Sequence, residues 1–352
     1  MLNLSSIAAN GWMMDPERLQ DIGRKAFDAA SVIYPAVLIS GLVQSAWLAG
    51  DSGCLAYMKL ENEQVTKSFK VRGATYKVAS LPVDNLHVVT CSSGNHALAV
   101  LHACQATQKS PLRHPHIFLP TTVSASKRRK LEDAGASITF FGDDTIDTEL
   151  EARRVASRLG YPYISPYNDK EVAGGQGTIA LELLSQLPAH ELDAVFVPVG
   201  GGGLISGIAS VLAAHRPKVK VVGCQPENSC IMAKSMKAGM VVNEPSRNTL
   251  SEGTAGGVEE DTITFKPCHE LVDDWVTASE VEIASAMISA TKELHGAVEG
   301  AAAMAMACFI KERHKYRGKH VVVICCGGNV GADALDQAAQ LAQSSPCRAL
   351  HE

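Results

Sequence analysis

The stretch Lys67-Ser68-Phe69-Lys70-Val71-Arg72-Gly73-Ala74 follows a predicted strand over residues 56–61 and opens a predicted helix. Ser68 is of a residue type that caps helix N-termini, so we expect Lys70 in the first helical turn. The positive end of the helix dipole disfavours a second positive charge there by about 0.3–1 kcal/mol, and burial would disfavour it further. A neutral lysine amine attacks carbonyl compounds and forms Schiff bases. Lys70 is therefore a candidate for chemistry, although most such lysines are solvated surface groups.

Short apolar runs alternate with longer amphipathic runs from residue 87 onward. This alternation predicts strands over residues 87–90, 116–119, 137–141, 194–199, 220–224 and 320–325. It predicts helices over residues 96–106, 124–134, 148–159, 178–187, 204–215, 280–294 and 300–312, a last helix from Ala332, and a loop over 243–267. A separate N-terminal helix is predicted over residues 16–31. Such alternation is typical of α/β proteins with parallel sheets. Because two series of elements meet near Tyr167, we expect two open, mostly parallel sheets flanked by helices, with ligands at the carboxyl ends of the strands.

Composition excludes several classes of protein. With 352 residues, 46% of them hydrophobic and 20% charged, the chain can bury a large core and form one or two soluble domains. A net charge of -5 argues against a nucleic-acid partner, and the basic cluster Lys127-Arg128-Arg129-Lys130 is interpreted as a solvated helix face. Residues 1–18 lack the pattern of a signal peptide, and no apolar segment is long enough to span a bilayer. No membrane partner is expected.

The ten cysteines show no CxxC spacing. Several of them, such as Cys91, Cys224 and Cys325, end apolar runs as reduced core cysteines do. We expect free thiols in a reducing compartment, which predicts a cytoplasmic protein.

The motif Cys91-Ser92-Ser93-Gly94-Asn95-His96 closes a predicted strand and opens a predicted helix. Hydroxyl groups, an amide and free backbone N–H groups at a helix N-terminus suit a bound anion such as a carboxylate. An ordinary Ser/Asn cap with a turn glycine would give the same pattern. The motif predicts a carboxylate site, with a structural cap as the alternative.

The tetrad Gly200-Gly201-Gly202-Gly203 also lies between a predicted strand and a predicted helix. Consecutive glycines let successive backbone N–H groups point at one anion, which is how a phosphate is held. No Gly-Lys-Ser/Thr sequence follows, so this is not a P-loop, and Ile205 and Ser206 stand where the GxGxxG pattern needs its third glycine. The tetrad predicts a phosphate site and disfavours, without excluding, a dinucleotide site.

Cys326-Gly327-Gly328-Asn329 follows the predicted strand over 320–325 and places a thiol beside a glycine turn. A hydrogen-bonding group there could meet the ring nitrogen of a flat cofactor, and a buried cysteine in a tight turn is the alternative. Glu299, in an Ala-rich helical region, could approach the ring of such a cofactor, but we interpret it as structural, either as a helix cap or as a member of an ion pair.

Five motifs taken together resemble the fold-type II pyridoxal phosphate enzymes, and among them the serine/threonine dehydratase and serine racemase family. They occur in the family's order. The matching stretches are Ser68–Ala74, Ser92–His96, Ala173–Thr178, Gly200–Leu204 and Cys326–Asn329. The resemblance implies the tryptophan synthase β-like fold, with residues 1–85 and 168–352 as a large cofactor-binding domain and residues 86–167 as a small α/β domain.

The resemblance also implies that pyridoxal 5'-phosphate is the cofactor and that Lys70 is the Schiff-base lysine. Besides Lys70, the cofactor-binding residues would be Phe69, Asn95, Gly200, Gly201, Gly202, Gly203, Leu204 and Cys326. Asn95 would bond the cofactor's 3′ oxygen, and Cys326 would face the pyridine nitrogen. Because a thiol has a reference pKa of about 8.5, that nitrogen is expected to stay unprotonated. The residues expected to bind an amino-acid substrate are Ser92, Ser93, Gly94, Asn95, His96 and Tyr167.

We therefore expect an L-threonine/L-serine dehydratase that forms a 2-oxo acid and ammonia by α,β-elimination. Lys70 would remove the Cα proton, and a general acid, the cofactor phosphate, would help the β-hydroxyl to leave. Serine racemase is the alternative, because Ser93 matches the serine that returns a proton from the opposite face in racemases. Tyr167 favours elimination, since racemases tend to carry asparagine there. A nucleotide-binding module, the non-enzyme alternative, would explain Gly200–Gly203 but neither Lys70 nor Ser92–His96.

Further features refine this expectation. Gln225 and Ile231 stand where metal-binding racemases carry carboxylates, so no Mg²⁺ or Ca²⁺ is expected there. The segment 250–265 is similar to the loop of dehydratases that act on larger β-hydroxy amino acids, such as the hydroxyectoine-utilisation enzymes, which leaves the substrate side chain open. The chain ends at Glu352 soon after its last predicted helix, so control by isoleucine through a regulatory domain is not expected. A homodimer is expected from the resemblance alone.

Overall fold

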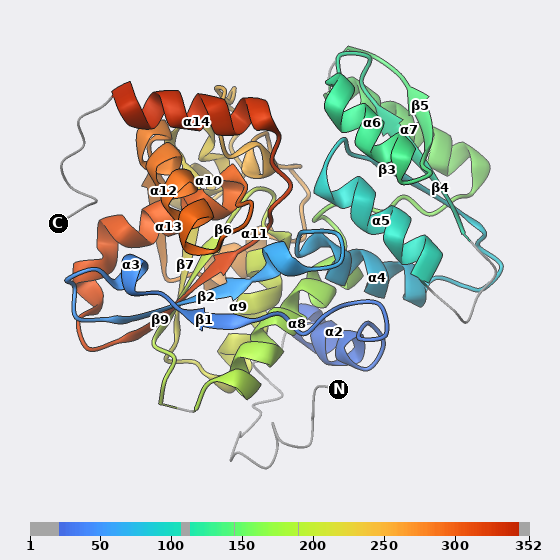
Figure 1. Ribbon diagram of the computed structural model, residues 1–352. Helices are drawn as coiled ribbons and strands as arrows, with labels where there is room; N and C mark the ends of the chain where they lie inside the picture. Colours follow the sequence, from blue (N-terminus) through green and yellow to red (C-terminus); the bar gives the residue numbers. More distant parts are fainter. Residues whose placement is uncertain (1–20, 107–112, 144, 189, 345–352) are drawn as a thin grey trace.

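The computed structural model describes residues 21–106, 113–143, 145–188 and 190–344 (Figure 1). Within these residues the strands form a six-stranded sheet in the order β1-β2-β9-β6-β7-β8 and a three-stranded sheet in the order β3-β4-β5. Among the described strands, β1 pairs antiparallel with β2, and the other neighbours are parallel. The strands are β1 Leu42–Gln44, β2 Leu55–Leu60, β3 His87–Cys91, β4 His114–Leu119, β5 Ser137–Phe140, β6 Ala194–Pro198, β7 Lys220–Pro226, β8 Asp274–Ala278 and β9 His320–Cys325. The predicted α/β class with two mostly parallel sheets is confirmed.

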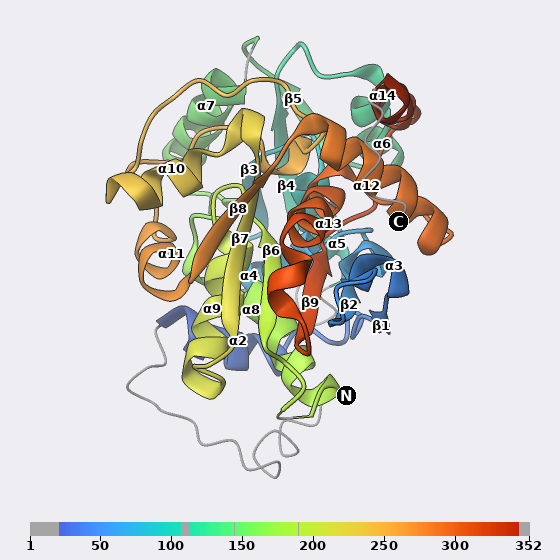
Figure 2. The same cartoon turned by 90° about the vertical axis from the view of Figure 1, so that its left-hand side faces the viewer.

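Helices cover both faces of the six-stranded sheet, with α8 and α9 on one side and α12 and α13 on the other (Figure 2). The three-stranded sheet and helices α5, α6 and α7, which we call the three-stranded unit, lie to one side of the larger sheet (Figure 1). The helices are α2 Asp21–Ala30, α3 Ala46–Ala49, α4 Lys70–Ser80, α5 Asn95–Ala106, α6 Ala125–Asp133, α7 Thr145–Leu159, α8 Lys170–Gln186, α9 Gly203–His215, α10 Ile231–Ala238, α11 Phe265–Leu271, α12 Glu280–Glu293, α13 Gly300–Glu312 and α14 Ala332–Ser344.

Several predicted elements differ from the observed ones. The helix predicted from residue 178 begins at Lys170, and the loop predicted over 243–267 contains a short 3-10 helix at Glu252–Thr254 and the first residues of α11. The predicted N-terminal helix is observed from Asp21, and its first part lies outside the described residues. The sequence pattern did not predict β1, α3, α10 or β8. β1 is a three-residue strand at the sheet edge, and β8 is mostly half-buried, so neither has a long apolar run.

The prediction that Ser68 caps α4 is wrong. The N-cap residue is Phe69, and it makes no side-chain capping bond. Ser68 instead pairs with Gly327 in an isolated antiparallel bridge, so its backbone is held by the turn after β9. Lys70 nevertheless lies in the first helical turn, as predicted.

Glycines allow α4, α8 and α9 to cross at close range. A Cβ on Gly175 in α8 would lie 2.6 Å from the Cα of Gly73 in α4, closer than real Cβ contacts allow. A Cβ on Gly207 in α9 would lie 2.3 Å from the carbonyl oxygen of Ala173 in α8. The Gly-rich motif at residues 173–178 is therefore helix packing that supports α4, the helix that carries Lys70.

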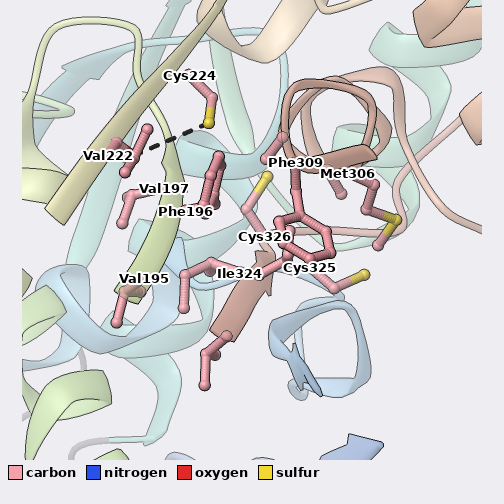
Figure 3. Close-up of a cluster of buried hydrophobic side chains, with 14 of the residues drawn as sticks. Val195, Phe196, Val197, Val222, Cys224, Met306, Phe309, Ile324, Cys325 and Cys326 are labelled. Carbon is pink, nitrogen blue, oxygen red and sulfur yellow. Dashed lines mark hydrogen bonds between the residues drawn. The ribbon is translucent and has the colours of Figure 1, made fainter. Parts of the chain in front are cut away.

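The core of the six-stranded sheet packs against α13 (Figure 3). Phe196 of β6 meets Phe309 of α13 edge to face, with ring centroids 5.2 Å apart. Cys224, Cys325 and Cys326 are buried in the same cluster. The nine cysteines within the described residues are free thiols, as predicted. In the described part of the chain, no helix is long and apolar enough to cross a membrane.

A buried ion network ties the start of α4 to β2 and α8. The Arg72 guanidinium contacts Glu61 at 2.7 Å and Glu182 at 2.6 Å. The Lys59 ammonium contacts Glu182 at 2.5 Å and donates to the Ser40 carbonyl at 2.9 Å. The four charged side chains are fully buried. Although burial opposes the shift, the charges of Arg72 and Lys59 hold the pKa of Glu182 below its usual value, so this carboxylate stays ionised.

We expect Arg72→Met to lower the free energy of unfolding by about 3–5 kcal/mol, because it leaves two buried carboxylates beside one cation. Urea denaturation followed by circular dichroism measures the change. Arg154 forms an ion pair with Glu151 on the surface of α7, so Arg154→Met is the matched control and should leave stability nearly unchanged. A loss for Arg72→Met no larger than that of the control would contradict the importance of the network.

Candidate active site

The ends of three parallel strands meet near the start of α4. β3 is followed by Ser92–Asn95, β6 by Gly200–Gly202, and β9 by Cys326–Asn329. The Phe69 N–H donates to the Cys326 carbonyl at 3.0 Å, which places the turn after β9 directly beside Lys70. Motifs that are far apart in the sequence are thus collected around one lysine.

Lys70 has an amine suited to nucleophilic or base chemistry. Its Nζ donates to the Pro166 carbonyl at 2.8 Å and lies 5.2 Å from the centroid of the Phe69 ring. Burial lowers the pKa of Lys70 to about 8, while negative charge at Cys326 and Glu299 would oppose that shift. The neutral fraction of this amine near neutral pH is therefore much larger than that of an ordinary lysine.

Glu299, interpreted from the sequence as structural, lies within the group of candidate residues. Its carboxylate accepts from Asn95 Nδ2 at 2.9 and 3.1 Å and from the Cys326 thiol at 3.7 Å. Burial raises the pKa of Glu299, although the bonds from Asn95 and Cys326 oppose the change. Asn95 and Glu299 are 204 positions apart in the sequence, so no local pattern could have revealed the contact.

Cys326 is buried beside Glu299. Burial raises the pKa of the Cys326 thiol well above its usual value, and the Glu299 charge raises it further. Cys326 therefore stays a neutral thiol. Its predicted position toward a ring nitrogen stays a prediction.

The segment Ser92–His96 turns the chain into α5. Ser92 Oγ accepts from the Gly94 N–H at 3.2 Å, and Ser93 is half-buried beside it. The His96 side chain is buried and lies 3.0 Å from the Ile164 carbonyl through Nε2. Burial, with the charge of nearby Lys70, lowers the pKa of His96 to about 3, so the imidazole is neutral and Nε2–H donates to that carbonyl. Of the His96 groups, the backbone N–H is then the one left to donate to a bound anion. The role of His96 in binding a substrate carboxylate stays a prediction.

The glycine tetrad joins β6 to α9. Gly202 has a φ of +87°, a left-handed conformation that favours glycine. A Cβ on Gly201 would lie 2.4 Å from the ring of Tyr167, so a side chain at this position would displace that ring. The first N–H groups of α9, up to the buried Leu204, have no acceptor within the helix, and they lie at its positive end. This arrangement suits a phosphate.

Tyr167 packs on the glycine tetrad and is held by the loop over residues 252–264. Its hydroxyl accepts from the Glu259 N–H at 3.2 Å, and burial raises the pKa of that hydroxyl. The Glu259 carboxylate contacts Arg153 of α7 and Asn168, each at 2.9 Å. The loop thereby links the three-stranded unit to the backbone beside the tetrad.

The basic cluster at residues 127–130 is exposed at Arg128, Arg129 and Lys130, as the sequence-based interpretation expects, and half-buried at Lys127. Arg128 forms an ordinary surface pair with Glu132 one turn away. Lys127, however, contacts Glu252 at 2.8 Å, and Lys130 donates to Asn329 Oδ1. Two lysines of this face therefore also reach residues outside the three-stranded unit, which the sequence-based interpretation did not include.

The Gln225 side chain stands where metal-binding racemases are expected to carry a carboxylate ligand, and it is hydrogen-bonded to the backbone. Its Nε2 donates to the Val199 carbonyl at 3.1 Å, and its Oε1 accepts from the Ala233 N–H at 2.7 Å. Ile231 is buried. Across the described part of the chain, His, Cys, Asp and Glu form no group of three or more that could hold a metal ion.

The chain is similar to a set of known enzymes. The model of a family described as pyridoxal-phosphate dependent enzyme matches residues 33–327. An L-threonine ammonia-lyase of Thermotoga maritima is 33% identical over 321 residues, which cover 91% of this chain and 77% of that protein. The catabolic L-threonine dehydratase of Escherichia coli is 34% identical over 285 residues, which cover 80% of this chain and 84% of the relative.

Solved structures give a similar result. Threonine deaminase isoform 2 from Solanum lycopersicum matches with a TM-score of 0.85 and 29% identity, over 92% of this chain and 89% of that chain. Maize serine racemase matches with a TM-score of 0.81 and 30% identity, over 92% of this chain and 98% of that chain.

We expect a small aldehyde to capture Lys70 with a rate that rises through about pH 8, because only the neutral amine reacts. Exposed lysines, with an ordinary pKa of about 10.4, should react at higher pH. Borohydride reduction of the adducts and mass spectrometry of the peptides measure each rate, with Lys70→Arg as the blank. If Lys70 reacted with the same midpoint as the exposed lysines, burial would not have changed its pKa as described.

Proposed function

The chain belongs to the family of pyridoxal-phosphate dependent enzymes, and from that premise we propose that it is an L-threonine/L-serine ammonia-lyase. The observation that carries the proposal is the lowered pKa of Lys70, to about 8, beside strand-end motifs that suit a phosphate and a carboxylate. Relatives named as threonine ammonia-lyase and threonine dehydratase support this reaction over others of the family.

The residues present fit pyridoxal 5'-phosphate. Lys70 supplies the amine for its aldehyde, and the N–H groups of Gly200–Gly203 suit its phosphate. We assign Asn95 to the ring hydroxyl oxygen and Cys326 to the ring nitrogen. When bound, the cofactor withdraws electrons from the substrate Cα, which makes the Cα proton removable. Because Cys326 stays a neutral thiol, it adds no strong acid at the ring nitrogen.

Different residues of the chain then bind the substrate and remove its proton during elimination. The Ser92–Asn95 turn and the His96 N–H hold the substrate carboxylate at the start of α5. Lys70, whose pKa is lowered to about 8 and whose Nζ lies beside the Pro166 carbonyl, accepts the Cα proton in its neutral form. The β-hydroxyl takes up a proton and leaves as water, which balances the proton lost from Cα, and the enamine that remains takes up water to give a 2-oxo acid and ammonia.

We propose a structural role for Tyr167, which shapes the pocket. Its hydroxyl is already engaged by Glu259, and its ring packs on Gly201. We therefore assign it to orienting the phosphate loop and forming a wall for the substrate, and the loop over 252–264 to adjusting which β-hydroxy side chain fits.

Racemisation is the second candidate activity. Ser93 is half-buried at the start of α5, where a hydroxyl could return a proton to Cα, and maize serine racemase has a similar fold. The same site would then produce some inverted amino acid beside the 2-oxo acid.

The assembly and location are also proposals. We propose a cytoplasmic homodimer with a cofactor-binding domain over residues 1–85 and 168–352 and a small domain over 86–167. Free thiols among the described residues support the reducing location, and membership of the three-stranded sheet supports the domain division. The homodimer is supported by the family resemblance alone.

We expect the purified holoenzyme to release ammonia from L-threonine and L-serine, and Lys70→Ala to lose at least about 100-fold of that rate because the base is gone. Incubation with a panel of β-hydroxy amino acids, scored for ammonia and for enantiomer composition, makes the measurement. Ser93→Ala should retain elimination and lose any racemisation. Near-normal ammonia release by Lys70→Ala with bound cofactor would contradict the assignment.

We also expect chelation by EDTA to leave ammonia release unchanged, because Gln225 and Ile231 offer no anionic oxygen to Mg²⁺ or Ca²⁺. The assay compares rates before chelation, after chelation, and after Mg²⁺ is restored. Loss on chelation with recovery on Mg²⁺ would show that a hard cation binds elsewhere in the protein.

A further inference from the structure

A chain of hydrogen bonds runs from the surface of α6 to the candidate active site. Lys130 Nζ donates to Asn329 Oδ1, in the turn after β9. Asn329 Nδ2 donates to Asn95 Oδ1 at 2.7 Å, and Asn95 Nδ2 donates to Glu299 at 2.9 Å. Asn329 Nδ2 also donates to the Thr66 carbonyl at 2.8 Å, a few residues before Lys70.

The direction of each hydrogen bond in this series follows from the two groups at its ends, the Lys130 ammonium and the Glu299 carboxylate. A lysine ammonium can only donate, so it requires the oxygen of the Asn329 amide. The Asn329 nitrogen is then turned toward Asn95, whose oxygen accepts and whose nitrogen faces the Glu299 carboxylate. The ammonium at one end and the carboxylate at the other favour the same orientation of both amides.

Helices α5 and α6 of the three-stranded unit both contact the side-chain amide of Asn329. Asn95 begins α5 and Lys130 lies on α6, and both contact Asn329. Partial burial lowers the pKa of Lys130, and the negative charge of Glu299 opposes that shift, which places the ammonium within the electrostatic reach of the site. Lys130 thus differs from Arg128 on the same helix, which pairs with Glu132.

We propose that Lys130 is a positioning residue for the reaction. Acting through Asn329, it orients Asn95 between Glu299 and the cofactor oxygen that Asn95 is assigned to bind. The inference rests on the proposed function for that assignment. Lys130 itself touches neither the substrate nor the cofactor.

The test compares Lys130→Met with the parent holoenzyme. We expect the absorbance band of the bound cofactor to shift, and kcat/KM for L-threonine to fall by roughly tenfold, mainly through kcat, because a charged hydrogen bond that orients Asn95 is lost. Lys130→Arg keeps a cationic donor and should restore both the spectrum and most of kcat. Arg129→Met removes the same charge from the neighbouring position of α6 and should match the parent.

Each other outcome overturns the inference. A Lys130→Met protein with the parent's spectrum and kcat would show that Asn95 does not depend on this lysine. A lower melting temperature with an unchanged spectrum would indicate a structural contact only. Equal losses in Lys130→Met and Arg129→Met would indicate an effect of net charge. The proposed function fails separately, if the parent holoenzyme releases no ammonia, and the spectral comparison then still decides the role of Lys130.

Discussion

The buried pairing of Arg72 with Glu61 and Glu182 is the constraint on which the rest of the site depends. Arg72 is two residues after Lys70 on α4, so the carboxylates that hold its guanidinium also set where the lysine amine lies. The charges of the network are balanced by Lys59, which keeps the burial of so much charge tolerable. Close crossing of α4 over α8 at Gly73 and Gly175 fixes the same helix by shape. The ion pairs of Arg72 and the close packing of α4 on α8 therefore fix the same position of the Lys70 amine.

Burial then changes the chemistry of the groups placed around that amine. Removal from water disfavours charge, so the pKa of Lys70 falls while those of Glu299 and Cys326 rise. For Lys70 this shift increases the neutral fraction of the amine, which suits proton transfer at a carbon acid near neutral pH. The glycine tetrad, by contrast, uses backbone dipoles that do not titrate. In the proposed site, proton exchange is therefore assigned to side chains such as Lys70, and binding of the negatively charged phosphate to the backbone N–H groups of the glycine tetrad.

The parts of the site that were predicted are those with a local signal. Glycine runs and a lysine at a helix start can be recognised within a few residues, and the predicted motifs at residues 92–96, 200–204 and 326–329 lie where a strand ends. Glu299, Lys130 and Glu259 were missed as site residues because their contacts join positions about 90 to 200 apart. The error at Ser68 has the same origin: a residue suited to capping was taken up by pairing with Gly327, which only the folded turn brings near.

Most of the strands and helices and the parallel sheets follow from sequence alone, because alternation of apolar runs and the placement of glycine act over short distances. Lys70 was singled out as the candidate reactive lysine by its place at the start of a helix and by the family resemblance. The orientation of the Asn95 amide, the shifted pKa of Lys70 and the contacts of α6 with the turn after β9 were decided by tertiary structure. The physical reason is that desolvation and hydrogen-bond direction depend on every neighbour in space, and most of those neighbours are remote along the chain.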